Sequence, residues 1–129
     1  MSSKGRPYRT VDIEGWETLV GRGDADNDYL TFRVASQRDW WLHVGGGTPG
    51  SHVVIRNPDG TEAPLEVIRQ ASQLAAWYSK ARAASRVEVH YCRVSEVSKR
   101  RGAPKGEVMI RKFKKLKVVP SRLDTDDDD

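Results

Sequence analysis

The chain has 129 residues, of which 37% are hydrophobic and 31% are charged, and its net charge is +4 at pH 7. This length and composition predict one domain with a modest core, and no apolar run is long enough to cross a bilayer. Cys92 is the single cysteine, which excludes an intramolecular disulfide and a zinc site built on several thiolates. Because the first eight residues are polar and lack the apolar segment of a secretory signal, we expect a cytoplasmic protein that does not bind membranes.

The positive charge is concentrated towards the C-terminus. Residues 1–98 carry equal numbers of basic and acidic side chains, whereas residues 99–123 carry ten Lys or Arg and one acidic residue, Glu107. The segment favours binding to a polyanion, although a solvated basic strand is the plainer alternative. The last six residues, 124–129, are expected to form a disordered acidic tail that competes weakly for the same surface. We name nine of these basic side chains the basic run: Lys99, Arg100, Arg101, Lys105, Arg111, Lys112, Lys114, Lys115 and Lys117.

The first elements along the chain are predicted to be a hairpin and a short helix. Residues 8–13 and 16–21 are rich in β-branched and aromatic side chains, and they flank a turn at Glu14-Gly15. Residues 22–28 are rich in Asp, Asn and Gly, which are typical of helix N-termini. We therefore expect a short helix that is capped in this acidic stretch and continues through Val34.

A second hairpin is predicted from residues 39–44 and 51–56, which are joined by Gly45-Gly46-Gly47-Thr48-Pro49-Gly50, the glycine loop. If Val44 lies opposite Ser51, then His43 pairs with His52 and Trp41 with Val54. Because side chains alternate along a strand, one face of the hairpin is expected to be apolar and to face the core. The apolar face then holds Trp40, Leu42, Val53 and Ile55, and the opposite face holds Asp39, Trp41, His43, His52 and Arg56.

The remaining elements are a long helix and the strands that close a sheet. Apolar residues at three- and four-residue spacing predict a helix from Pro64 to Ala84, and alternation predicts a strand over 86–94. Residues 107–113 and 116–119 are typical of one closing strand or a pair of strands. The sequence therefore predicts an α+β fold, in which a single domain (residues 1–123) has a mostly antiparallel, curved sheet packed against one main helix.

Catalytic motifs are weak in this sequence. The glycine loop lacks the lysine spacing of a nucleotide-binding P-loop and precedes a strand. Asp39, His43 and His52 could suggest a metal site, but the predicted register separates Asp39 from the histidines by two residue pairs. No serine lies in a nucleophile-elbow sequence, and a lone Cys92 on a strand is typically inert. We therefore predict a protein that is not an enzyme and that uses no metal, cofactor or small-molecule substrate.

Nucleic-acid binding is better supported by the residue types. Aromatic and imidazole rings can stack on unpaired bases, while Lys and Arg neutralise phosphates. Trp41, His43, His52 and Arg56 supply the first kind of group, and the basic run supplies the second. These groups point to an RNA-binding surface whose phosphate contacts make affinity depend on salt.

Several segments, in order, resemble the NFACT-R domain of fibronectin-binding-protein-like ribosome quality-control factors, which also occurs in small stand-alone bacterial proteins. They are Val20-Gly21-Arg22, Asn27-Asp28, Leu30-Thr31-Phe32, Asp39, Trp41-Leu42-His43, residues 49–55, residues 75–82, Val87 to Tyr91, Val94 to Lys99 and Gly102-Ala103-Pro104-Lys105-Gly106. The resemblance implies an RNA-binding, non-catalytic module. Its expected partner is tRNA or rRNA, with the large ribosomal subunit as a candidate partner. It also adds weight to Asp39, His43, Ser51, His52 and Lys80 as RNA-binding positions.

Two other functions remain open from the sequence. One is a metal-assisted RNA-processing hydrolase that uses Asp39, His43 and His52, if these side chains converge on one face. The other is an adaptor that docks on a ribosomal protein through Trp16 or Trp77. Metal content would test the first, and binding after nuclease treatment would test the second.

Overall fold

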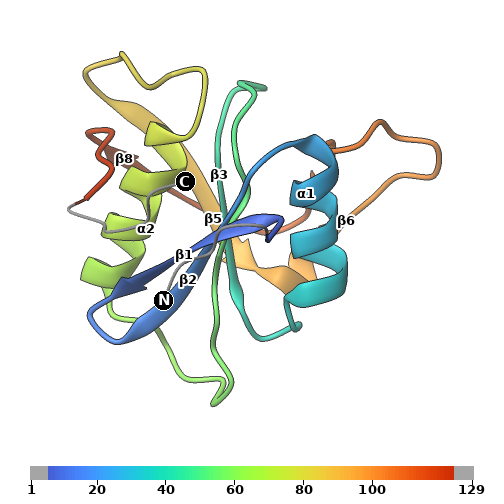
Figure 1. Ribbon diagram of the computed structural model, residues 1–129, viewed down its shortest axis with the longest axis horizontal. Coiled ribbons are helices and arrows are strands. Elements are labelled where there is room, and N and C mark those ends of the chain that lie inside the picture. The colour runs from blue at the N-terminus through green and yellow to red at the C-terminus, as the bar shows by residue number, and fades with distance from the viewer. Residues whose placement is uncertain (1–5, 124–129) are drawn as a thin grey trace.

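The computed structural model describes residues 6–123 and is built on a six-stranded antiparallel sheet (Figure 1). The strand order is β1-β2-β4-β3-β5-β8, and a separate two-stranded sheet pairs β6 with β7. The α+β fold with a mostly antiparallel sheet is therefore confirmed. The strands are β1 (Tyr8–Ile13), β2 (Trp16–Gly21), β3 (Trp40–Val44), β4 (Val53–Ile55), β5 (Val87–Arg93), β6 (Val97–Ser98), β7 (Met109–Ile110) and β8 (Lys114–Val118).

The register of the second hairpin is the predicted one. Trp41 of β3 lies opposite Val54 of β4, and Leu42 lies opposite Val53. In the first hairpin, Ile13 pairs with Trp16, and both turn residues have positive φ, 50° at Glu14 and 90° at Gly15. Because a one-residue slip would turn every side chain to the other face, this register fixes which residues reach the core.

One face of the sheet packs against α2 (Leu65–Trp77), the predicted main helix. Val67, Ile68, Ala71, Leu74 and Ala75 are buried along its inner side. They contact the apolar face of the hairpin, in which Leu42, Val53 and Ile55 are completely buried. This layer is the core that the spacing predicted.

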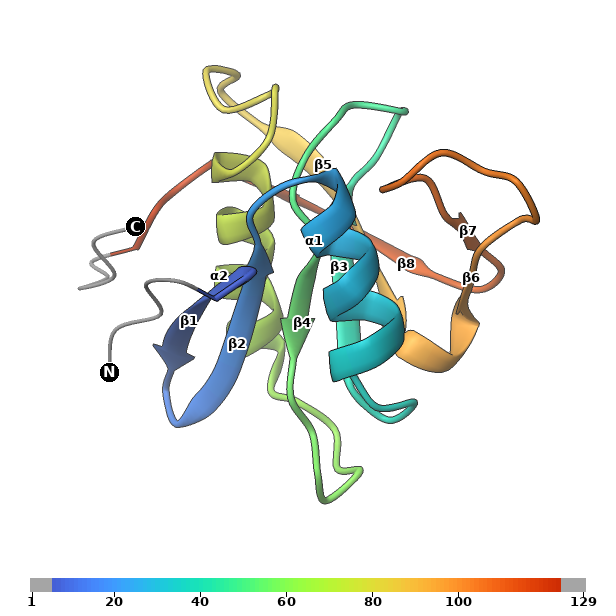
Figure 2. The ribbon, with the colours of Figure 1, turned by 45° about the vertical axis from the view of Figure 1, so that its right-hand side comes forward.

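The opposite face of the sheet is also covered, which the sequence analysis did not predict. α1 (Asp24–Tyr29) continues into a π-helical segment, η1 (Leu30–Val34), and the two lie across the sheet from α2 (Figure 2). A second apolar cluster forms there around Leu30, Trp41, Val54 and Cys92. The expected polar face is thus largely a second core layer, since a hydrophobic face of a sheet is stable only when another element covers it.

The helix predicted to run from Pro64 to Ala84 is shorter in the structure. It ends at Trp77, and the next residue, Tyr78, has φ −91° and ψ 45°, outside the helical region. The chain there pairs with the glycine loop instead: Gly50 bridges Ser79, and the Lys80 amide donates to the Pro49 carbonyl at 2.9 Å. These backbone hydrogen bonds replace the helical ones that residues 78–84 would have made.

The C-terminal strands also differ from the prediction. Only Met109–Ile110 of residues 107–113 forms a strand, and this strand pairs with β6 rather than with the main sheet. β8 closes the main sheet beside β5. The acidic tail, residues 124–129, lies outside the described residues. Within residues 6–123, no helix is long and apolar enough to cross a membrane.

Candidate nucleic-acid interface

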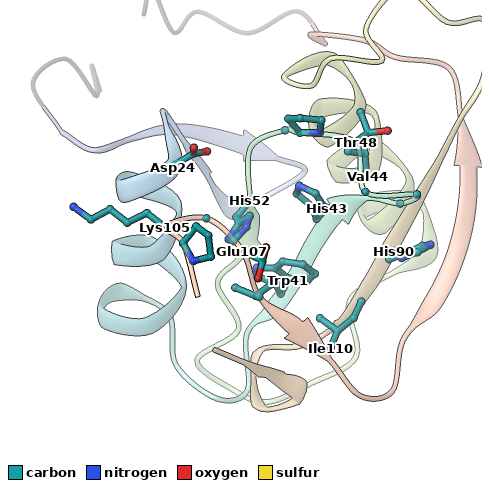
Figure 3. A pocket seen from close by; sticks show the side chains of 18 residues that line it. Asp24, Trp41, His43, Val44, Thr48, His52, His90, Lys105, Glu107 and Ile110 are labelled. Atoms are coloured by element: carbon teal, nitrogen blue, oxygen red, sulfur yellow. The ribbon is translucent and has the colours of Figure 1, made fainter. Parts of the chain in front are cut away.

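A pocket of about 490 Å³ lies between the glycine loop, the start of α1 and residues 104–110 (Figure 3). We name it the glycine-loop pocket. Its polar side chains come from α1, β3, β5, the glycine loop and the chain just after it, and the loop between β6 and β7. Those labelled in the figure are Asp24, His43, Thr48, His52, His90, Lys105 and Glu107, with Trp41 at the base.

The antiparallel register brings three histidines to this pocket. His43 of β3 lies opposite His90 of β5, and the ring centroids of His43 and His52 are 5.3 Å apart. The Trp41 indole stacks on His43 at 5.9 Å and meets the edge of His52 at 5.0 Å. Trp41 and His52 are 2% and 1% exposed, so these two rings form the floor of the site.

A buried hydrogen-bond chain fixes His52. The Trp41 indole N–H donates to Thr31 Oγ1 at 3.3 Å, and Thr31 Oγ1 lies 2.8 Å from His52 Nδ1. The Thr31 hydroxyl therefore bridges the Trp41 indole and the His52 imidazole and fixes the orientation of the ring. The His52 amide also donates to Asn27 Oδ1 at 3.0 Å.

The imidazoles of His43 and His52 are uncharged at neutral pH. Burial, and to a smaller extent the neighbouring His43, lowers the pKa of His52 to about 3. Burial likewise lowers the pKa of His43, and the charge of His90 acts in the same direction. The lining also holds the carboxylates of Asp24 and Glu107 beside Lys105, so the pocket suits a heteroaromatic ring better than a phosphate.

Two glycines of the loop are required by close packing. A Cβ on Gly45 would lie 2.4 Å from His90 Nε2, and a Cβ on Gly50 would lie 2.7 Å from Ser79 Cβ. Gly46 and Gly47 have φ of 70° and 73°, a conformation that other residues rarely adopt. The glycine content therefore lets the loop fold close to β5 and to the turn after α2.

Asp39 and Arg56 lie apart from this pocket, in an ion pair whose carboxylate is buried. Asp39 Oδ2 is 2.8 Å from Arg56 Nε, and Asp39 also accepts from the Asn57 and Ser36 amides at 2.7 and 2.9 Å. The carboxylate is 0% exposed, so its contacts serve the fold. The structure thus does not bring Asp39 to His43 and His52, and residues 6–123 hold no group of three His, Cys, Asp or Glu side chains placed to bind a metal ion.

Ser51 and Lys80 lie on the other side of the glycine loop. Ser51 Oγ donates to the Gly21 carbonyl at 2.6 Å, and its amide donates to the Tyr78 carbonyl at 2.9 Å. The Lys80 side chain is exposed and lines a second hollow of about 340 Å³. We name this hollow the arginine hollow, because Arg9, Arg22 and Arg82 also line it.

The basic run divides into paired and free side chains. Lys99 Nζ is 3.0 Å from Asp28 Oδ2 and donates to the carbonyls of Pro104 and Glu107, which holds the loop that follows β6. Arg100 pairs with Glu107, and Arg111 pairs with Glu96. The side chains of Arg101, Lys105, Lys112, Lys114, Lys115 and Lys117 are exposed and form no ion pair within residues 6–123.

The free cations of β8 point to two sides of the sheet. Lys115 lies opposite His90 and Lys117 opposite Glu88, so these two share the face of the glycine-loop pocket. Lys114 lies opposite Tyr91 and therefore faces the α2 side. Contiguity in sequence hence does not make the basic run a single surface.

Sequence reasoning missed two residues that support the pocket, Asn27 and Thr31. Both are buried polar side chains on α1 and η1, and they hold the backbone and the ring of His52. Both residues lie in segments that resemble a known family, and this was the available signal. A polar side chain on the buried side of a short helix requires a hydrogen-bond partner, which here is His52.

A family model, the NFACT protein RNA binding domain, matches residues 6–112 of the chain. The protein named Rqc2 homolog RqcH of Bacillus subtilis (strain 168) is 44% identical over 122 residues, which cover 91% of this chain. The Rqc2 homolog RqcH of Streptococcus suis (strain 05ZYH33) is 39% identical over 117 residues, or 90% of this chain. In each case the chain spans about one fifth (21%) of the relative's length.

A solved structure shares the fold. The C-terminal part of the fibronectin/fibrinogen-binding protein from Streptococcus suis superposes with a TM-score of 0.82 at 36% sequence identity. The match covers 92% of this chain and 47% of that one. The overall fold is therefore common to this chain and that structure.

Proposed function

This chain belongs to the NFACT RNA-binding domain family, as its motifs predicted, and on that premise we propose that it binds tRNA or rRNA without catalysing a reaction. In this proposal the glycine-loop pocket receives one unpaired base. The free cations of the basic run neutralise phosphates, with Lys105, Lys115 and Lys117 on the pocket's side of the sheet. The paired members of the run hold the protein's own loops.

The observation that carries the proposal is that free cations lie beside the uncharged rings of the pocket. Lys105 lines the pocket, and Lys115 lies directly across the strand pair from His90, which also lines it. A ring in the pocket would therefore have positive charge on two sides. Single-stranded RNA is recognised by this combination of ring contacts and phosphate contacts.

The setting that we propose is ribosome quality control, with the large ribosomal subunit as partner and a cytoplasmic location. It is supported by the similarity to the RqcH proteins, which extends over most of this chain but only one fifth of theirs. The proposal concerns only the part of those proteins that this chain matches.

The absence of catalysis is also part of the proposal. Asp39 is engaged by Arg56 and two backbone amides, which leaves it no place in a metal site with His43 and His52. Burial raises the pKa of the Cys92 thiol to about 12, which makes it a poor nucleophile. Purified protein incubated with tRNA and Mg²⁺ should leave the RNA intact, and metal-dependent cleavage lost in His43→Ala would favour the hydrolase.

The main test is equilibrium binding of labelled tRNA at two salt concentrations, with a duplex DNA of similar charge as competitor. Lys112→Ala, Lys114→Ala and Lys115→Ala combined should weaken all RNAs alike and flatten the log–log salt slope by roughly 2 to 3, at about 0.7 to 0.9 per lost contact. A matched control removes three exposed cations elsewhere, Arg33, Arg38 and Arg86. Equal changes in affinity and salt slope for the two triple variants would mean that the basic run does not contact the RNA.

The pocket has a separate test. Thr48→Trp places a large side chain in its lining, and it should weaken RNA with unpaired bases more than fully paired RNA. Ser85→Trp, at an exposed position outside the pocket, is the control. Failure of the wild-type protein to prefer tRNA over DNA would contradict the proposed function. Capture of a ribosomal protein that survives nuclease treatment would then favour the adaptor that uses Trp16 or Trp77.

A further inference from the structure

We propose that the arginine hollow is a second, sequence-independent phosphate-binding site, which takes phosphodiester groups of the RNA whose base occupies the glycine-loop pocket. This inference rests on the proposed function and adds residues outside the basic run. The hollow has a volume of about 340 Å³ and is lined by four cationic side chains, Arg9, Arg22, Lys80 and Arg82. Asp24 is the one carboxylate in its lining.

The cations come from three parts of the chain that the fold brings together. Arg9 lies on β1, Arg22 directly follows β2, and Lys80 and Arg82 lie in the turn after α2 (Figure 1). The Arg22 amide donates to the Pro7 carbonyl at 3.3 Å, which ties the end of β2 to the start of β1. The bridge between Gly50 and Ser79 fixes the turn after α2 against the glycine loop. The backbone around the hollow is thus hydrogen-bonded on each side.

Two of the guanidinium groups are held by aromatic rings. Arg9 Cζ lies 4.4 Å from the centre of the Tyr78 ring, and Arg82 Cζ lies 4.7 Å from that of Trp77. Arg82 Nε also donates to the Trp77 carbonyl at 2.7 Å. Stacking restricts the orientation of a guanidinium, so less side-chain entropy is lost when its edge binds a phosphate. The planar fork of arginine matches two phosphate oxygens.

Three uncharged polar side chains of the hollow are already used by the protein. Ser51 Oγ donates to the Gly21 carbonyl, and Ser79 Oγ donates to the Ala76 carbonyl at 2.7 Å. Asn27 accepts from the His52 amide through Oδ1 and donates to the Gly50 carbonyl through Nδ2. Charge is therefore what the hollow offers to a ligand, which fits contacts to a phosphate backbone rather than readout of a base.

Position favours RNA as the occupant over an acidic protein segment. The arginine hollow and the glycine-loop pocket share Asp24, Pro49 and Gly50 in their linings, so they lie side by side across the glycine loop. A strand with one base in the pocket passes over this loop, and its neighbouring phosphates reach the hollow. An acidic peptide would use the hollow but would gain little from the pocket beside it, whose lining holds uncharged imidazoles and the carboxylates of Asp24 and Glu107.

The test uses the full chain and labelled tRNA at two salt concentrations. Lys80→Gln with Arg82→Gln should lower affinity roughly tenfold and flatten the salt slope by about 1.4 to 1.8, the value for two lost phosphate contacts. Both positions are exposed, so folding should be preserved, and unchanged unfolding in urea would verify this. Arg33→Gln with Arg86→Gln removes the same charge outside both cavities and should leave affinity within twofold of the wild type. Lys80→Arg should keep full affinity.

The outcomes separate this inference from the function on which it rests. If wild-type protein binds tRNA and the Lys80/Arg82 variant matches the Arg33/Arg86 control, the second phosphate site is wrong while RNA binding stands. If wild-type protein does not bind RNA, the proposed function itself fails. Binding of polyglutamate in preference to tRNA, lost in the Lys80/Arg82 variant alone, would assign the hollow to an acidic protein partner and overturn the RNA assignment.

Discussion

The glycine-loop pocket and the basic run both drew attention from the sequence, but they differ in what surrounds them. The floor of the pocket is held by hydrogen bonds between side chains 10 and 21 residues apart, from Trp41 to Thr31 and from Thr31 to His52. The basic run is a contiguous segment whose free lysines face solvent on two sides of the sheet. Residue types that bind ligands thus become scaffold when they are buried, whereas exposed cations stay available to a partner.

Asp39 belongs with the buried group, although it was expected at the RNA-binding surface. Its carboxylate faces Arg56 and two backbone amides and is closed to solvent. Lys99 is the corresponding exception within the basic run, because it is bonded to Asp28 and to two carbonyls. Variants at Asp39 and Lys99 test whether burial and hydrogen bonding, rather than residue type, decide if a side chain stabilises the fold or contacts RNA.

The largest effect is expected for Asp39→Ala. Removal of the carboxylate leaves the Asn57 amide buried without its acceptor and Arg56 without its partner. We expect the free energy of unfolding to fall by about 3 kcal/mol, the lower end for a broken buried pair, because Arg56 is one-third exposed. Urea denaturation measures this. Unchanged stability combined with lost RNA affinity would instead make Asp39 a contact residue.

Acidification should destabilise the protein through the buried histidines. The pKa of His52 is about 3 in the folded protein against 6.5 in the unfolded chain, so the unfolded chain binds more protons between these values. His52 therefore contributes stability that is complete above pH 6.5 and is lost as the pH falls towards 3.

The expected loss from His52 between pH 7 and pH 5 is about 2 kcal/mol, and His43 acts in the same direction. Urea denaturation at pH 7, 6 and 5 measures the slope. His52→Gln should have a shallower slope even if it is less stable at pH 7. The same slope in both proteins would mean that His52 is not held neutral.

The smallest effect is expected for Lys99→Ala compared with Lys112→Ala. Loss of the Lys99 contacts should lower the free energy of unfolding by about 1 kcal/mol, because one ion pair and two hydrogen bonds disappear. Lys112→Ala should change stability by less than about 0.5 kcal/mol and lower RNA affinity more than Lys99→Ala does. Both quantities come from urea denaturation and tRNA titration of the same preparations. The reverse pattern would place Lys99 at the interface.

The sequence by itself determined the two hairpins, the register of the second one and the presence of the main helix. Alternation fixed which side chains of residues 39–44 share a face, and the apolar spacing of Val67, Ile68, Ala71 and Leu74 fixed the inner side of α2. These features depend on neighbours within a few residues, and for that reason a local pattern reveals them. The family was also visible in the sequence, and its model matches residues 6–112.

Only the tertiary structure decided which of those residues are open to a ligand. α1 and η1 cover the second face of the sheet and bury Trp41 and His52, a contact that joins Thr31 to a residue 21 positions away. The pairing of Gly50 with Ser79 ends α2 early and brings Lys80 and Arg82 into a hollow with Arg9 and Arg22. Such burial depends on packing between distant segments, and no local period in the sequence records it.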